Sequence, residues 1–147
     1  MRSSLIIGIM AFTILVAGCG KKAPPYSGPT VTQSFRDDFV AQEEKVAESS
    51  QMIVYAGANT NQMPNIVLTV SEIWKGAHDA STLGITNGTQ LSISGGDIVG
   101  GLPDGAIVFI PVADSPAIAL QKRQVTFVRS GRVLDITVQE FKKRLRL

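Results

Sequence analysis

The stretch NIVLTVSEIW (residues 65–74) decides the fold, because its apolar and polar residues alternate over most of its length. A period of two is typical of a β-strand with one buried and one solvated face. Thr69 and Ser71 belong to the polar face. The opposite face is expected to carry the apolar side chains Ile66, Leu68, Val70 and Trp74. We therefore expect a β-rich domain built around this strand.

Further short apolar runs on both sides of this stretch predict more strands. They are residues 51–57, 90–94, 106–112, 117–120, 124–128 and 132–136. Leu91 and Ile93 should be buried in the second run, which follows an Asn87-Gly88 hairpin signal. The run AIVFIPV (106–112) is apolar on both faces and predicts an interior strand. Turn residues at Asp104-Gly105 and Ser130-Gly131 separate the later runs, and this spacing predicts a closed barrel or a sandwich.

A helix is predicted at each end of the domain. In residues 34–50 we expect Ser34 as N-cap, Asp37 and Asp38 in the first turn, and one apolar face, which either packs on the domain or docks on a partner. That face carries Phe35, Phe39, Val40 and Val46. At the other end, Thr137 and Glu140 form a capping box. The helix it opens should pack Phe141 and Leu145 on the barrel and carry basic residues in its last turns: Lys142, Lys143, Arg144 and Arg146.

The segments IVLTVSEIWKG (66–76), NGTQLSISGGD (87–97) and LPDGAIVFI (102–110) together resemble the small secreted barrels of the OB-fold type, related to netrin-like and metalloprotease-inhibitor domains. The resemblance covers about residues 52–112 and implies the fold: mainly β, a small OB-like β-barrel with flanking N-terminal and C-terminal helices. Those inhibitors use an N-terminal cysteine in a disulfide-bonded wedge, and a chain with one cysteine has no internal disulfide. The inhibitory function is therefore not implied, and no functional residue is transferred.

The first residues have the pattern of an export signal: Arg2, an apolar run over residues 5–17, and small residues before Cys19. The run is shorter than the ~20 residues of a membrane-spanning helix. Val16-Ala17-Gly18-Cys19 resembles the lipobox of bacterial lipoproteins. That resemblance implies removal of residues 1–18, a lipid thioether on Cys19, and two or three acyl chains that anchor the protein stably. The resemblance also implies that Gly20 at the second mature position, in place of an Asp retention signal, favours the outer membrane, facing the periplasm, in an organism that has one. In a single-membrane bacterium the same signal would place the protein on the cell surface.

Residues 19–33 are rich in proline and glycine and predict a lipidated, flexible tether. Lys21 and Lys22 within it either lie against anionic headgroups or serve solubility. Residues 34–147 then form the folded domain. The net charge of +2 does not suggest a nucleic-acid partner, and one cysteine excludes a cysteine-rich zinc or iron–sulfur site. No catalytic residue, metal site or cofactor is predicted.

His78, Asp79 and Ser81 are the residue types of a hydrolase triad, but residues this close in one loop do not reach the relay geometry. The glycine-rich residues 94–105 lack a phosphate-binding motif and predict turns. Trp74 is interpreted as a core or rim residue, with a binding anchor as the alternative.

The expected function is a non-catalytic binding module with an envelope protein partner. Its candidate surface is Trp74, Lys75, His78 and Asp79. The alternatives are an inhibitor of an envelope protease, and a hydrolase or metalloenzyme using His78 with Asp79 or Asp97.

Overall fold

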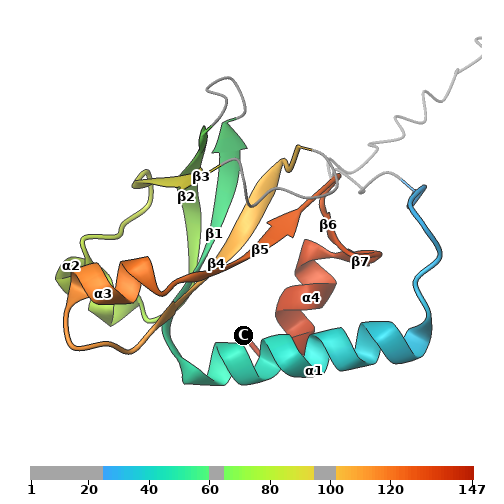
Figure 1. The fold of residues 1–147 in the computed structure, drawn as a ribbon, viewed down its shortest axis with the longest axis horizontal. Helices are drawn as coiled ribbons and strands as arrows, with labels where there is room; N and C mark the ends of the chain where they lie inside the picture. The colour runs from blue at the N-terminus through green and yellow to red at the C-terminus, as the bar shows by residue number, and fades with distance from the viewer. Residues whose placement is uncertain (1–24, 60–64, 95–101) are drawn as a thin grey trace, which may run out of the picture.

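The computed structural model describes residues 25–59, 65–94 and 102–147, which form a curled antiparallel sheet with helices on both faces (Figure 1). Five strands form this half-barrel in the order β3-β2-β1-β4-β5. Their bounds are β1 (Ser50–Asn59), β2 (Asn65–Lys75), β3 (Gln90–Ser94), β4 (Gly105–Pro111) and β5 (Gln124–Val128). The mainly β prediction is thus confirmed. Cys19 and Asp97 lie outside the described residues, as do the predicted signal segment and the start of the tether.

The strand order places β4 beside β1, which gives the Greek-key arrangement 4-1-2-3. Among the described residues the outermost strands β3 and β5 are not paired with each other, so the sheet curls without closing. One side chain links these two regions instead. Arg123, between α3 (Pro116–Gln121) and β5, donates to the carbonyl oxygens of Leu120 at 2.6 Å and Ser92 at 2.7 Å.

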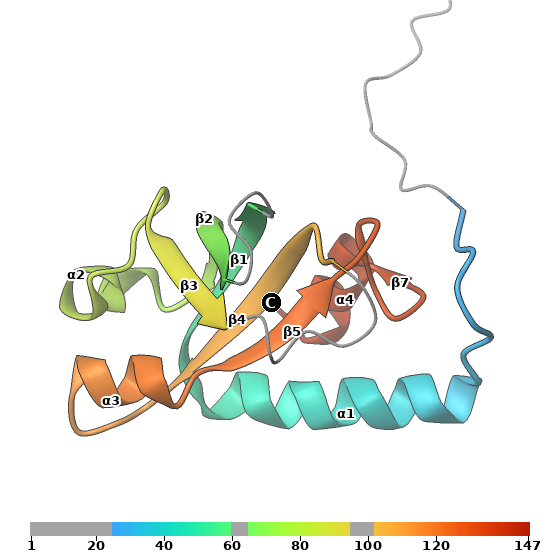
Figure 2. The ribbon, with the colours of Figure 1, turned by 45° about the horizontal axis from the view of Figure 1, so that its top comes forward.

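Each face of the sheet buries its own apolar core. The first core lies under α2 (Ala80–Leu83) and α3 and includes Leu68 and Val108. The second lies under α1 (Gln33–Ser49) and α4 (Val138–Arg144), and Figure 2 shows α1 running below the sheet. Strand β4 contributes side chains to both cores, and its residues 105–110 are all buried. The predicted interior strand is therefore confirmed.

Strand β2 changes face near its end, which corrects the prediction for Trp74. Where β2 pairs with β1, Ala56 lies opposite Val70 and Tyr55 lies opposite Glu72, so Ser71 between them has no partner in the ladder. A second irregularity, between Ile53 and Val54, leaves Trp74 without a partner in the ladder as well. An extra residue in one strand reverses the alternation of the side chains that follow. Ile66, Leu68 and Val70 thus join the first core, whereas Trp74 packs against the second. Its predicted place on their face was wrong.

The N-terminal helix is confirmed, but its cap is not the predicted one. Helix α1 begins at Gln33, and the Thr32 hydroxyl accepts from the Phe35 amide, so Ser34 is not the N-cap and the first turn holds no acidic residue. Phe39, Val40 and Val46 pack against the second core, so this face lies on its own domain. Phe35 differs from the prediction, because 57% of it is exposed.

Two other predictions are corrected by helical segments. Residues 117–120 lie in α3 and not in a strand, because Ser115 caps the segment and Pro116 starts it. Asn87-Gly88 forms a turn before β3, but β2 and β3 are joined through η1 (Ala77–Asp79) and α2 and not by a two-residue hairpin. Leu91 and Ile93 are buried as predicted.

The C-terminal segment agrees with its prediction except at residues 134–135, which form a turn that divides the strand predicted over residues 132–136. Ser130 and Gly131 have positive φ angles in the turn between β5 and β6 (Arg132–Val133), and β6 pairs with β7 (Ile136–Thr137). Thr137 accepts from the Glu140 amide and caps α4. Phe141 and Leu145 are buried in the second core, as predicted.

Candidate functional site

The four residues of the predicted binding surface follow one another at the end of β2, but the structure divides them between different environments. Trp74 and Lys75 are half-buried and directed to the helices of the second core, whereas His78 is exposed in η1. Gly76 separates the two pairs with a φ of 78°. The residues therefore do not form one continuous surface of the kind the sequence suggested.

Trp74 is held between side chains of its own domain. Its ring stacks on Tyr55 with centroids 5.8 Å apart, and the Lys142 Nζ lies 5.2 Å from the centroid of the indole. The indole Nε1 donates to Glu72 Oε2 at 3.0 Å, and Lys142 is 3.6 Å from the same carboxylate. Burial, with smaller effects of Asp104 and Glu72, raises the pKa of Tyr55. This cluster fastens α4 to the sheet.

Lys75 and His78 have separate local roles. The Lys75 Nζ donates to the carbonyl oxygens of Ala47 at 2.7 Å and Glu48 at 3.2 Å, so it satisfies the C-terminal carbonyls of α1. The His78 side chain is 86% exposed, and its Nε2 lies 3.3 Å from Asp79 Oδ2. No group of three or more metal-ligating side chains is found among the residues that the structure describes.

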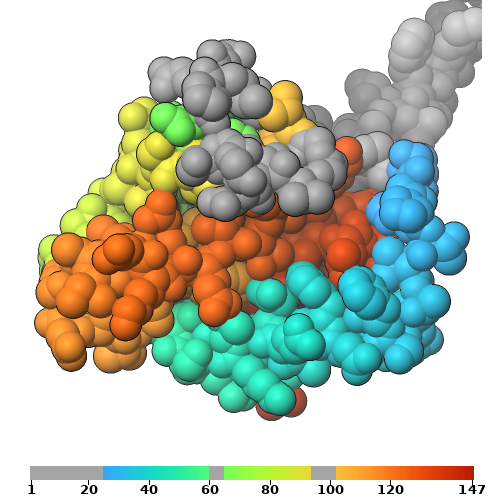
Figure 3. Space-filling model, viewed as in Figure 1, coloured from blue at the N-terminus to red at the C-terminus, as the bar shows by residue number. Residues whose placement is uncertain are grey.

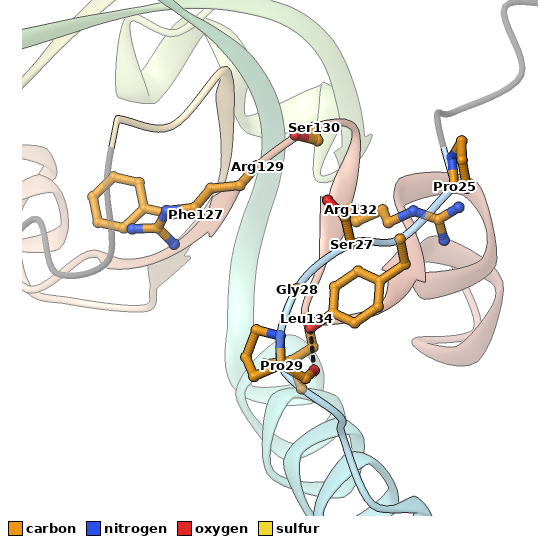
Figure 4. A pocket seen from close by; sticks show the side chains of 10 residues that line it. Pro25, Ser27, Gly28, Pro29, Phe127, Arg129, Ser130, Arg132 and Leu134 are labelled. Atoms are coloured by element: carbon orange, nitrogen blue, oxygen red, sulfur yellow. Dashed lines mark hydrogen bonds between the residues drawn. The ribbon is translucent and has the colours of Figure 1, made fainter.

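A cavity of about 530 Å³ lies where the described part of the tether meets the end of the sheet (Figure 4). We call it the tether cavity. Residues 25–29 form one wall, and the other wall comes from the end of β5 and the residues that follow it: Phe127, Arg129, Ser130, Arg132 and Leu134. Two segments about a hundred residues apart in the sequence thus build one site, and Figure 3 shows the start of the described chain passing beside the C-terminal segment.

The tether wall is fixed by two sets of interactions. Within the tether, the Tyr26 hydroxyl donates to the Pro29 carbonyl at 2.7 Å. At its end, Arg36 of α1 donates through Nε to Asp135 Oδ1 at 2.8 Å, its Nη2 bonds the other carboxylate oxygen, and the Val31 carbonyl also accepts from Nη2. The hydrogen bond from Arg36 holds the pKa of Asp135 below its usual range. This pair ties the start of α1 to the β6–β7 turn.

The tether cavity is cationic and aromatic. The Arg129 guanidinium lies 5.7 Å from the centroid of the Phe127 ring, and Arg132 donates through Nη1 to the Asp135 carbonyl at 3.0 Å. None of the described residues that line it is acidic. Two carboxylates lie in the adjoining turns: Asp135 is bound by Arg36 and also interacts with the charge of Arg132, and Asp104 accepts from the Gly131 amide at 3.0 Å. Such a lining suits a ligand that is anionic in one part and apolar in another.

The sequence does not predict this cavity. A local signal was present, since Arg129 and Arg132 flank the Ser130-Gly131 turn that was predicted. The opposite wall, however, comes from residues about a hundred positions earlier, and no spacing rule relates the two segments. The composition of residues 19–33 predicts only a flexible tether, whereas residues 25–29 form a wall of the cavity.

Comparisons of the chain with protein-family models, curated proteins and solved structures gave no match. Within residues 25–59, 65–94 and 102–147, no helix has the length and apolar character needed to cross a membrane.

Proposed function

We propose that the protein is a lipid-anchored lipoprotein of the bacterial envelope whose folded domain is a non-catalytic binding module. The anchor is Cys19, acylated after removal of residues 1–18, and the location is the periplasmic face of the outer membrane. The support for the anchor is the sequence pattern that ends at Cys19. The observation that carries the binding role is the tether cavity, which Phe127, Arg129 and Arg132 line together with residues 25–29 of the tether.

We also propose that the domain is of the OB type. An OB-fold is a five-stranded, partly open Greek-key barrel. The sheet order β3-β2-β1-β4-β5 and the Arg123 bridge toward Ser92 support this assignment. The fold is compatible with many activities, so the binding role rests on the cavity and not on the fold.

Localisation and binding are tested separately in cells. Cys19→Ala should accumulate as an unprocessed or unanchored precursor, and normal membrane retention of this variant would refute the lipid anchor. A photo-crosslinking amino acid at Ser130, in the cavity wall, should capture an envelope component at native abundance. The same label at Gln139, which is exposed on α4, serves as the control. Identical capture from both positions, or capture from neither, would count against a binding role for the cavity.

A further inference from the structure

The described start of the tether, residues 25–31, has a definite local structure. The Tyr26 hydroxyl donates to the Pro29 carbonyl at 2.7 Å and closes a short loop. The Tyr26 ring lies against Gly28, because a Cβ built on this glycine would be 2.6 Å from the tyrosine hydroxyl oxygen. Residues 25–30 are nevertheless all exposed, and segments with little buried surface open locally at a lower free energy than the whole domain.

The turn between β6 and β7 meets this segment through both of its residues. Asp135 accepts from Nε and Nη2 of Arg36, and the same Nη2 donates to the Val31 carbonyl at 3.4 Å. Leu134 lines the tether cavity together with residues 25–29 (Figure 4). A polar contact and an apolar wall therefore hold the tether side by side.

Leu134 is an unusual residue for its place in this turn. Its φ is +54°, a left-handed conformation that strains a residue with a Cβ and that glycine adopts freely. Its side chain is half-buried, yet the two apolar cores formed by the described residues do not include it. Strained residues of this kind gather at functional contacts. The contact that the structure offers to this side chain is the tether cavity.

We infer that the β6–β7 hairpin, residues 132–137, is a clasp for the tether. Leu134 and Asp135 hold residues 25–31 against the domain, and release of the clasp frees this segment without unfolding the sheet. The clasp thereby sets how much of the tether is free between the anchor and the domain.

The consequence for the reach of the domain rests on the proposed acylation of Cys19. With the clasp closed, Pro25 follows Cys19 by six residues, which span at most about 22 Å when fully extended. With the clasp open, the free tether extends to Thr32, the N-cap of α1. Thr32 follows Cys19 by thirteen residues, which span at most about 47 Å. The clasp thus gives the domain a short and a long range of distances from the membrane.

Opening of the clasp is measured by chymotrypsin cleavage after Tyr26 in the full, acylated protein on phosphatidylcholine vesicles. A cut there releases the domain into the supernatant as a fragment that begins at Ser27. Leu134→Gly should be cut about fivefold faster than wild type, equivalent to about 1 kcal/mol, because the contact of a half-buried leucine is lost. An unchanged rate would overturn the clasp.

Arg146→Gly is the matched control. Arg146 also has a positive φ, +60°, but it pairs with Glu44 and does not line the tether cavity. Its substitution should leave cleavage after Tyr26 unchanged, and equal acceleration in both variants would overturn the role of Leu134. Global unfolding has its own sign: if cuts after the buried Phe141 accelerate equally, the release is not local and the clasp is refuted.

The two ranges of distance are tested in a variant that combines Leu134→Gly with Asp135→Asn and so lacks both contacts. Energy transfer from Trp74 to dansyl-labelled headgroups of the vesicles should be lower than in wild type, because the longer free tether lets the domain move away. Unchanged transfer would overturn the change of reach. Failure of the anchor is recognised separately, because an unacylated protein would not sediment with the vesicles, while its cleavage in solution still tests the clasp.

Discussion

Gly76 lies so close to β1 that a side chain at this position would collide with the backbone of that strand. It follows β2 with a φ of +78°, and a Cβ built there would lie 2.1 Å from the Gln51 carbonyl oxygen and 3.1 Å from the Met52 Cα. Both atoms belong to the backbone of β1, the central strand of the sheet. The contact cannot be relieved by turning a side chain, so Gly76→Ala must displace the start of β1 or the end of β2.

Gly84 provides a matched control. It also has a left-handed backbone, with φ +67°, but a Cβ there would meet nothing within 4 Å. Gly84→Ala therefore tests the conformational penalty alone, about 1–2 kcal/mol for a non-glycine residue in this region. Gly76→Ala adds the displacement of packed backbone beside buried Met52, and overpacking of this kind costs about 1–3 kcal/mol. The expected losses are thus about 2–5 kcal/mol at Gly76 and about 1–2 kcal/mol at Gly84.

The assay is urea unfolding, followed by the fluorescence of Trp74, the single tryptophan, and by circular dichroism. Free energies of unfolding come from linear extrapolation. A difference between the two variants of less than about 0.5 kcal/mol, the usual error of additivity, would refute the close approach of Gly76 to β1.

Three further predictions concern ionisable groups. Burial raises the pKa of Glu43 above 4.5, partly offset by the Thr126 hydroxyl, which donates to its Oε2 at 2.9 Å. The folded state therefore binds this proton more tightly than the unfolded state, and wild-type stability should fall as the pH rises from 4.5 through the folded pKa. Glu43→Gln should lack this fall and show a higher urea midpoint at pH 7; an equal or lower midpoint would contradict the burial. The Arg36 hydrogen bond lowers the pKa of Asp135 below 3.8, so Asp135→Asn should have a smaller free energy of unfolding than wild type at neutral pH. This gap in the free energy of unfolding should close as the pH falls from 3.8 through the folded pKa, because the wild-type carboxylate then becomes protonated. A gap that persists in acid would mean that the carboxylate charge is not what ties α1 to the β6–β7 turn. His78→Ala should change the free energy of unfolding by less than ~0.5 kcal/mol, since its side chain is 86% exposed. Loss of an envelope phenotype in this variant, with stability intact, would favour an enzymatic role for His78.

The strands were predictable because local pattern determines them. The alternation over residues 66–70 and the apolar run of β4 needed no long-range information. Trp74 shows where this fails: the irregularity at Ser71 arises from the pairing of β2 with β1, and the sequence of β2 alone does not contain it. The run 117–120 was too short for a period to distinguish strand from helix, and the Ser115 cap and Pro116 determined its structure.

The candidate site was less predictable than the fold. The predicted binding surface combines rare and charged residues that follow one another in the sequence: Trp74, Lys75, His78 and Asp79. In the structure, however, Trp74 contacts α4 and Lys75 contacts α1 of the same domain. The tether cavity depends on a contact between residues 25–29 and the end of β5. Contacts of this range follow from the tertiary fold, which brings both segments to one end of the sheet.

The central claim is that the domain is held on a membrane through Cys19, and mass spectrometry of the protein extracted from membranes tests it most directly. Trypsin should release an N-terminal peptide that begins at Cys19 and ends at Lys21, with the mass of a diacylglycerol thioether added. Base hydrolysis should reduce that added mass by its ester-linked acyl chains. A peptide that continues upstream of Cys19 with a free thiol, recovered from the native protein, would contradict the account.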